Sequence, residues 1–234
     1  MKLLRSIVNP FFLVLLILSF TIIGCGSGDE TVIPSITTTE TDGTTSVDDA
    51  ALDDVLDTLS ADDLSVAETD GLLFMREEEK LAHDVYIKMF MLGYPAIFEK
   101  ISNSEHTHTN AILTLLDRYN VPDPVGNNPE GVFVDPYLQN LYDDLIVLGA
   151  PSLTSALSVG AEIEEIDLID IQRLADALEG NRDILIVYEN LMKGSRNHLR
   201  AFVGKLAKEG VDYAPRHLSQ EEYDAVINAA IETN

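Results

Sequence analysis

The chain has 234 residues, and its 15 Lys and Arg residues against 40 Asp and Glu residues give a formal net charge of -25. So acidic a chain repels a phosphate backbone, which argues against nucleic acid as a partner. The single Cys excludes an intrachain disulfide and a zinc site built from several cysteines. Any bound metal must therefore be held by oxygen and imidazole ligands, which suit iron, manganese or zinc better than copper(I).

The N-terminus has the pattern of an export signal. A positively charged start precedes an apolar stretch that is too short to span a bilayer comfortably. The stretch ends Ile-Ile-Gly-Cys, which is similar to a bacterial lipobox, and we expect residues 1–24 to be a lipoprotein signal peptide and Cys25 to be lipidated. An ordinary signal peptide or an uncut anchor is the alternative. Gly26 is not the Asp that marks inner-membrane retention, so we expect an exported lipoprotein anchored to the outer membrane or cell surface.

The next segment, residues 25–70, is rich in Thr, Asp, Ser and Gly and poor in apolar residues. Such a composition buries too little apolar surface to fold, which predicts a disordered, acidic tether. A short helix near residues 50–59 is the one element that the pattern favours. The folded domain is expected to span residues 71–234.

Apolar residues recur at helical spacing in four long stretches of that domain. The expected core helices span residues 72–92, 95–119, 152–178 and 182–207. A long connection joins the second to the third and contains a short helix near 136–149, and Ser219 begins another short helix. We therefore predict an all-α fold, a four-helix bundle with a long crossover between its second and third core helices and short extra helices.

Each of these helices carries a polar residue at or near the centre of its apolar stripe. On the second helix, Glu105 and His108 form a Glu-x-x-His unit that points at the core. A buried charge is costly unless it is paired, and a metal ion is a suitable partner. The predicted ligands are Glu78, Glu105, His108, Glu164 and His198. Glu77 and Glu79 are interpreted as solvated acidic residues near a helix N-terminus.

Several neighbours of these residues complete the predicted site. Glu165 is the fallback for Glu164, because a helical wheel does not separate adjacent residues when a helix is irregular. Asp167, Ser195 and Asn197 are expected to support the ligands from around the site. Gly194 lowers helix propensity, so its place on the inward face suggests the close approach of a neighbour.

Four motifs resemble the DUF2202 family of the ferritin-like superfamily. They are MREEEKLA at 75–82, SEHTH at 104–108, GAEIEEID at 160–167 and GSRNHLRAF at 194–202. The resemblance implies a ferritin-like four-helix bundle but no established activity. The fourth helix of the superfamily usually carries Glu-x-x-His, whereas here Ser195 stands in the place of the second bridging Glu. Five protein ligands then leave a dinuclear site with an open position, a mononuclear site or a weak site.

Three functions follow from this pattern. The first is a redox metalloenzyme, in which a dinuclear iron or manganese site reacts with oxygen or peroxide in a ferroxidase-like or peroxidase-like way. The second is a non-catalytic metal-binding lipoprotein. The third is a structural or interaction bundle in which the Glu and His residues form a buried hydrogen-bond network without metal. The expected partners are metal ions and, through lipid on Cys25, a membrane. The sequence is also compatible with a homodimer.

Overall fold

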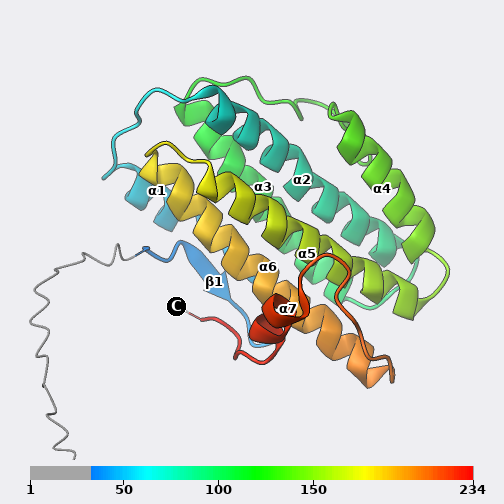
Figure 1. The fold of residues 1–234 in the computed structure, drawn as a ribbon. Helices are drawn as coiled ribbons and strands as arrows, with labels where there is room; N and C mark the ends of the chain where they lie inside the picture. Colours follow the sequence, from blue (N-terminus) through cyan, green and yellow to red (C-terminus); the bar gives the residue numbers. More distant parts are fainter. Residues whose placement is uncertain (1–32, 234) are drawn as a thin grey trace, which may run out of the picture. The chain divides into compact units, whose positions relative to one another are not determined.

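The computed structural model describes residues 33–233 (Figure 1). The expected signal peptide, Cys25 and the first part of the expected tether lie outside this range. Within it, no helix combines the length and the apolar character needed to cross a membrane.

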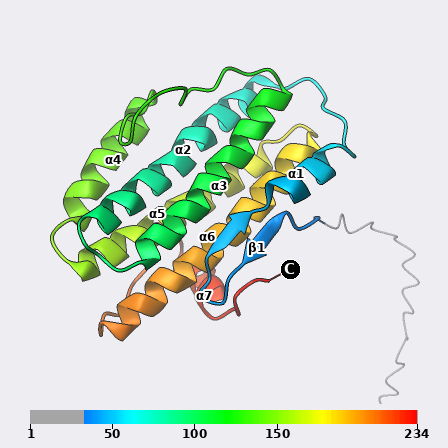
Figure 2. The same ribbon diagram turned by 180° about the vertical axis from the view of Figure 1, so that it is seen from behind.

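Four long helices form the main body of the described chain. They are α2 (Val66–Met91), α3 (Ile97–Arg118), α5 (Leu153–Asp176) and α6 (Arg182–Lys208). Helix α2 packs mainly against α3, and α5 packs mainly against α6, while α2 also contacts α5 and α3 contacts α6 (Figures 1 and 2). The structure is therefore mostly helical, as the sequence predicted.

The beginnings of these helices follow from local sequence. Helix α2 begins at a capping box in which the Ser65 hydroxyl accepts from the Glu68 N–H and the Glu68 side chain accepts from Ser65. This start lies six residues before the predicted one, because the first turn is polar and shows no apolar stripe. Ser152 caps α5 as predicted, by accepting from the N–H of Ser155.

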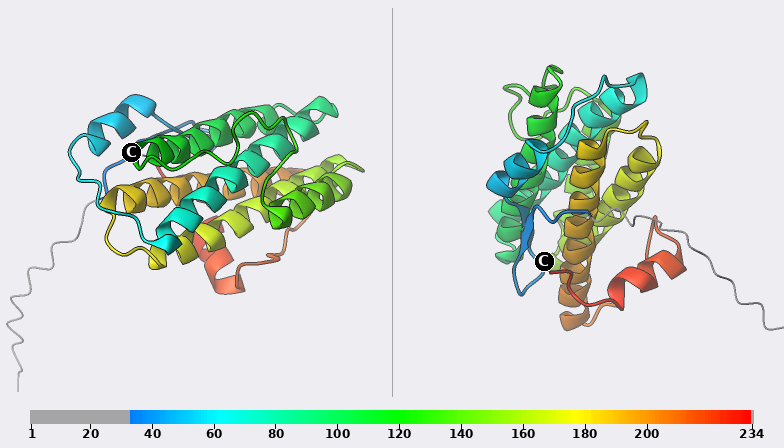
Figure 3. Two further views of the ribbon diagram at one scale, coloured as in Figure 1. Left: turned by 90° about the horizontal axis from the view of Figure 1, so that it is seen from above. Right: turned by 90° about the vertical axis from the view of Figure 1, so that its left-hand side faces the viewer.

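The long connection between α3 and α5 contains α4 (Pro136–Gly149), capped by Asp135. It lies along the outside of α2 and α5 (Figure 1). At the C-terminus, α7 (Gln220–Ile227) begins at the capping box of Ser219 and Glu222 and packs against α6 (Figure 3). Both short helices occur where the sequence predicted them.

The segment 33–70 differs from the expected disordered tether. Strands β1 (Thr37–Thr39) and β2 (Thr45–Val47) pair as an antiparallel hairpin, and α1 (Asp49–Leu56) follows. Strand β2 contacts α3 and α6, and the hairpin lies along these helices (Figure 2). Ile36 and Thr45 are fully buried. The hairpin is ordered although it has few apolar residues, because distant side chains bond its backbone. The Asn190 side chain accepts from the Ile36 N–H, and the Thr107 hydroxyl accepts from the Val47 N–H.

Candidate metal centre

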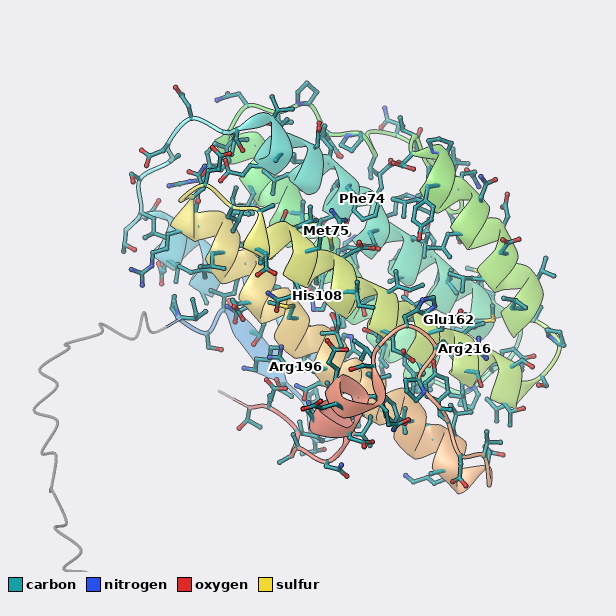
Figure 4. All side chains as sticks on the ribbon, in the orientation of Figure 1. Phe74, Met75, His108, Glu162, Arg196 and Arg216 are labelled. Atoms are coloured by element: carbon teal, nitrogen blue, oxygen red, sulfur yellow. The ribbon has the colours of Figure 1, made fainter. Side chains whose placement is uncertain are left out.

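The centre of the candidate site is the carboxylate of Glu105, which lies between two imidazoles. Its Oε2 is 2.6 Å from Nδ1 of His108, one turn later on α3. Its Oε1 is 2.8 Å from Nδ1 of His198 on α6. The two rings are stacked, with centroids 5.5 Å apart and planes 17° from parallel. Glu105 is 2% exposed and both histidines are fully buried, and Figure 4 shows His108 among the long helices.

Two further carboxylates complete the arrangement. On the His108 side, Oε2 of Glu79 lies 3.5 Å from the imidazole Nδ1. On the other side, Oε2 of Glu164 lies 3.7 Å from Nδ1 of His198. The described residues thus contain two groups able to hold a metal ion, Glu79–Glu105–His108 and Glu105–Glu164–His198, and Glu105 belongs to both. We call these groups the two triads. Each of the four long helices supplies at least one member.

Several inward-facing atoms of the triads have no partner with hydrogen-bond geometry in residues 33–233, although Glu105 lies at ion-pair distance from both imidazoles. These atoms are both carboxylate oxygens of Glu79, Oε1 of Glu105, Nδ1 of His108 and Nδ1 of His198. Buried polar groups almost always have a partner, so these atoms call for one. Two ligands of one ion, each about 2.1 Å from it, lie about 3 Å apart. The short nitrogen–oxygen separations around Glu105 fit that spacing, so the donor set suits a metal ion.

The ionisation of these groups reflects the same arrangement. Burial raises the pKa of Glu79 and of Glu164 to about 7, and the charge of Glu105 adds to both shifts. Burial also acts to raise the pKa of Glu105, but the charges of His108 and His198 outweigh it and hold that pKa far below its usual range. Burial opposes a charge on His108, yet Glu105 raises the pKa of this imidazole well above its usual value. Protons and metal ions therefore compete for the same atoms.

The geometry brings together four of the five predicted ligands, Glu105, His108, Glu164 and His198. Glu78 belongs to neither triad, and Glu79 occupies the place expected for it. The interpretation of Glu77 and Glu79 as solvated residues is wrong, because they are 3% and 1% exposed. Helix α2 is buried around most of its circumference near this point, so no single stripe marks its inner side. The line of Leu72, Met75, Glu79 and Tyr86, spaced three, four and seven residues apart, is the signal that was missed.

Glu165, the fallback ligand, binds the C-terminal segment of the chain. Its carboxylate faces the C-terminal segment and not the triads. It accepts hydrogen bonds from the Tyr213 hydroxyl and from the backbone N–H groups of Arg216, His217 and Leu218. Arg216 also pairs with Glu162, one helical turn away (Figure 4). Glu165 thus fastens the C-terminal segment to α5.

The three predicted supporting residues lie in two places. The Ser195 hydroxyl donates to Asp167, so these two side chains pair with each other across α5 and α6. The other Asp167 oxygen, Oδ1, has no partner among the described residues. Asn197 instead joins peripheral segments, since its amide donates to the Thr45 hydroxyl and to the Glu232 carbonyl.

Supporting residues that the sequence did not reveal lie on β2, α3 and α2. The Thr45 carbonyl accepts from Nε2 of His108 at 2.8 Å, and the Thr45 N–H donates to Nε2 of His198 at 3.1 Å. The Ser104 hydroxyl bonds the same carbonyl and lies 3.1 Å from Nε2 of His198. These contacts fix both rings so that Nδ1 faces the carboxylates. On the far side, the Tyr86 hydroxyl donates to Oε1 of Glu164 at 2.6 Å.

Gly194 has the close neighbour that its sequence position suggested. A Cβ atom at this residue would lie 2.6 Å from Cε1 and 2.9 Å from Nε2 of His108. Real Cβ contacts are not that short, so a larger residue would displace the ring. The absence of a side chain at 194 lets His108 approach α6.

Comparison with known proteins places this site in a family. The model of an uncharacterized protein domain, DUF2202, matches residues 68–230. The chain belongs to the DUF2202 family. It is 47% identical to the uncharacterized protein MJ0754 of Methanocaldococcus jannaschii over 169 residues, which is 72% of this chain and 91% of the relative. All five triad residues lie in the matched DUF2202 region, whereas the β1–β2 hairpin precedes it.

A solved structure supports the same assignment. The crystal structure of hypothetical protein MJ0754 from Methanococcus jannaschii superimposes with a TM-score of 0.72 at 46% sequence identity. The match covers 74% of this chain and 99% of that chain. This chain and MJ0754 therefore share their fold over nearly all of the crystallised chain.

Proposed function

We propose that this DUF2202 protein is a ferritin-like metalloprotein whose dinuclear iron or manganese centre reacts with oxygen or peroxide. The observation that supports the proposal is the pair of triads with orphaned inward atoms, joined by one shared carboxylate. Inward Glu residues and a Glu-x-x-His unit on a helical bundle are the ligand pattern of ferritin-like di-metal carboxylate proteins. The long crossover that contains α4 is the connection that such bundles use.

The residues divide into two matching half-sites. Glu79 and His108 would hold one ion, Glu164 and His198 would hold the other, and Glu105 would give one oxygen to each. Iron or manganese in this pair of positions would supply electrons to oxygen or peroxide. Ser195 stands where a second shared carboxylate is expected and bonds to Asp167 instead, so the pair of positions has one protein ligand fewer than that pattern supplies. The Tyr86 hydroxyl orients Glu164, and Thr45 orients both imidazoles.

The proposal includes a place in the cell. Lipid on Cys25 would anchor the exported protein to the outer membrane or cell surface. The excess of Asp and Glu over Lys and Arg would then attract cations to the surface of the domain.

A second candidate function is metal binding without turnover. Ser195 favours it, because a centre with one shared carboxylate has fewer charges to stabilise an oxidised pair of ions. The two candidates differ only in what happens after the metal is bound.

Metal analysis of the full chain tests the proposal. Purified in mild detergent and loaded anaerobically with Fe(II) or Mn(II), it should bind about two ions per chain, one per triad. Glu105→Gln should lose both ions, and Glu79→Gln and His198→Ala should each keep about one. Asp176→Asn is the control, because this exposed carboxylate on α5 bonds to Gln172 alone among the residues that the structure describes.

Oxygen and peroxide consumption by the reduced, loaded protein then separates the two candidates. Consumption that is lost in Glu105→Gln supports the redox centre. Two bound ions without consumption favour the second candidate. No bound metal would contradict both and leave a buried hydrogen-bond network as the role of the triads.

A further inference from the structure

Glu78 is a buried carboxylate that the proposed centre does not use. It is 4% exposed, and neither of its oxygens has a hydrogen-bond partner within the described chain. It lines a cavity of about 10 Å³ whose other walls are Leu81, Leu141, Ile163 and Ile166. That is about the space of one water-sized sphere. An unpaired carboxylate in apolar surroundings is costly, so the position calls for a function.

Carboxylates lie on both sides of Glu78. Toward the surface, the charge of Asp170 adds to the effect of burial in raising the pKa of Glu78, and the Asp170 side chain is 18% exposed. Toward the centre, Asp167 is 5% exposed and its Oδ1 is unpartnered in the described residues. Burial raises the pKa of Asp167 well above its usual value, and the charges of Glu79, Glu78 and Glu164 raise it further. Asp167 lies one helical turn after the triad residue Glu164 on α5, and its charge interacts with those of Glu78 and Glu79.

Asp167 and Asp170 are three residues apart on α5, so both project on the side that faces α2 and Glu78. We propose that Asp170, Glu78 and Asp167 form an entry path along which a divalent cation passes from the surface of α5 to the two triads. This inference rests on the proposed function, since the path needs a destination. Divalent cations such as Fe(II) and Mn(II) bind carboxylate oxygens readily. The path has no imidazole, so an ion is held there less firmly than in the triads and moves on.

Arg173 is the counter-ion at the outer end of this path. Its guanidinium is 2.7 Å from Asp170 and lies over the ring of Phe74, 5.8 Å from the centroid. The side chain is 57% exposed, so it can turn into solvent. An entering cation must displace the Arg173 guanidinium from Asp170. Loss of Arg173 should therefore speed entry, whereas loss of Glu78 or Asp170 should slow it.

The test is the rate of Co(II) uptake by the metal-free full chain, followed in a stopped-flow instrument through the visible absorption of bound Co(II). Glu78→Gln should slow uptake by about tenfold or more, while the final content stays at about two ions. Asp170→Asn should slow it by about threefold, and Arg173→Gln should speed it by about the same factor. Asp176→Asn removes an equal charge from the exposed face of α5 and should keep the wild-type rate.

Each contrary result has its own meaning. A wild-type rate in Glu78→Gln overturns the path and leaves the proposed function standing. A lower final content in Glu78→Gln also overturns it, because Glu78 would then be a ligand of the centre. Equal slowing in Asp176→Asn would assign the effect to overall charge, against the path. Failure of the wild-type chain to bind Co(II) would remove the proposed function and the path together. Asp170→Asn changes a surface residue, so its rate remains readable if Glu78→Gln folds poorly.

Discussion

Glu164 and Glu165 are neighbours on α5 and are almost equally buried, yet their carboxylates have different partners. Glu165 accepts three backbone N–H groups of the C-terminal segment as well as a tyrosine hydroxyl. Glu164 accepts from the Tyr86 hydroxyl and faces His198. The first carboxylate is stabilised by fixed dipoles of the chain itself, and the second lies where a cation can reach it.

Helix α2 shows the same contrast. Glu77 accepts from the backbone N–H groups of Val134 and Asp135, at 2.6 and 2.8 Å, and so fastens the crossover. Glu78 and Glu79, the next two residues, have no donor in the described part of the chain. The carboxylates therefore form two classes, clamped ones that hold segments together and unclamped ones directed at the centre or its approach. Burial alone does not separate the classes, but hydrogen-bond partners do.

The strongest test of this comparison substitutes one carboxylate of each class in two separate variants. Glu165→Gln puts an amide donor against backbone N–H donors and should lower the free energy of unfolding by about 3 kcal/mol. Burial raises the pKa of Glu78 well above its usual value, so Glu78→Gln replaces a carboxyl that is neutral in the metal-free protein and should leave its stability nearly unchanged. Urea unfolding of both variants, in the presence of a chelator, measures the difference. Equal destabilisation would show that the two classes do not exist.

The second test uses pH on the metal-free protein. Glu79 and Glu164 have pKa values of about 7 in the folded protein against an ordinary 4.5. Between pH 4.5 and pH 7 the folded state therefore binds more protons than the unfolded state. The free energy of unfolding should therefore fall as pH rises from about 4.5 through 7, by about 3 kcal/mol for each of the two groups. Melting temperatures at pH 5 and pH 8 with a chelator would show the fall. The double variant Glu79→Gln with Glu164→Gln should make the fall smaller, and a rise with pH would contradict the prediction.

The third test forces one imidazole away from the unclamped carboxylates. Gly194→Ala places a Cβ against His108, and the displacement should cost about 2 kcal/mol of stability in spite of the better helix propensity of Ala. Metal content should fall toward one ion per chain. Gly204→Ala is the matched control on α6, because no described atom lies within 4 Å of its added Cβ. A Gly194→Ala protein with two ions and unchanged stability would show that His108 tolerates the shift.

The smallest expected effect concerns the fixing of the rings. Ser104→Ala removes the hydroxyl that bonds the Thr45 carbonyl and lies beside Nε2 of His198. It should cost about 1 kcal/mol of stability and weaken metal binding by about tenfold. Thr114→Ala is the control for α3, because in the described part of the chain the Thr114 hydroxyl bonds to no group but the Asn110 carbonyl of its own helix. Identical metal affinities in the two variants would remove the positioning role of Ser104.

The sequence predicted the helices well, because apolar periodicity is a local property that tertiary packing then uses. It also marked Glu105, His108, Glu164 and His198, each of which interrupts a clear apolar stripe. It did not separate Glu78 from Glu79, since α2 is enclosed on nearly all sides and both residues are buried.

The hairpin was not predictable for a different reason. Its backbone donors and acceptors pair with side chains about 60 to 150 residues away, such as Thr107 and His198. The periodicity of apolar residues is evaluated over a short stretch of sequence, so it does not report contacts between residues that far apart. The same is true of Glu165, whose partners lie about 50 residues further on.

The region that the family model matches is shorter than the unit that folds, because it leaves out the β1–β2 hairpin. The family-matched region begins at residue 68, but Ile36 is part of the hydrophobic core and Thr45 bonds both imidazoles. A protein that consists only of residues 68–230 would present Nε2 of His108 and of His198 to solvent along the α3–α6 side. Family members without an equivalent strand must therefore seal that side with another segment, or operate with a wetter centre than this one.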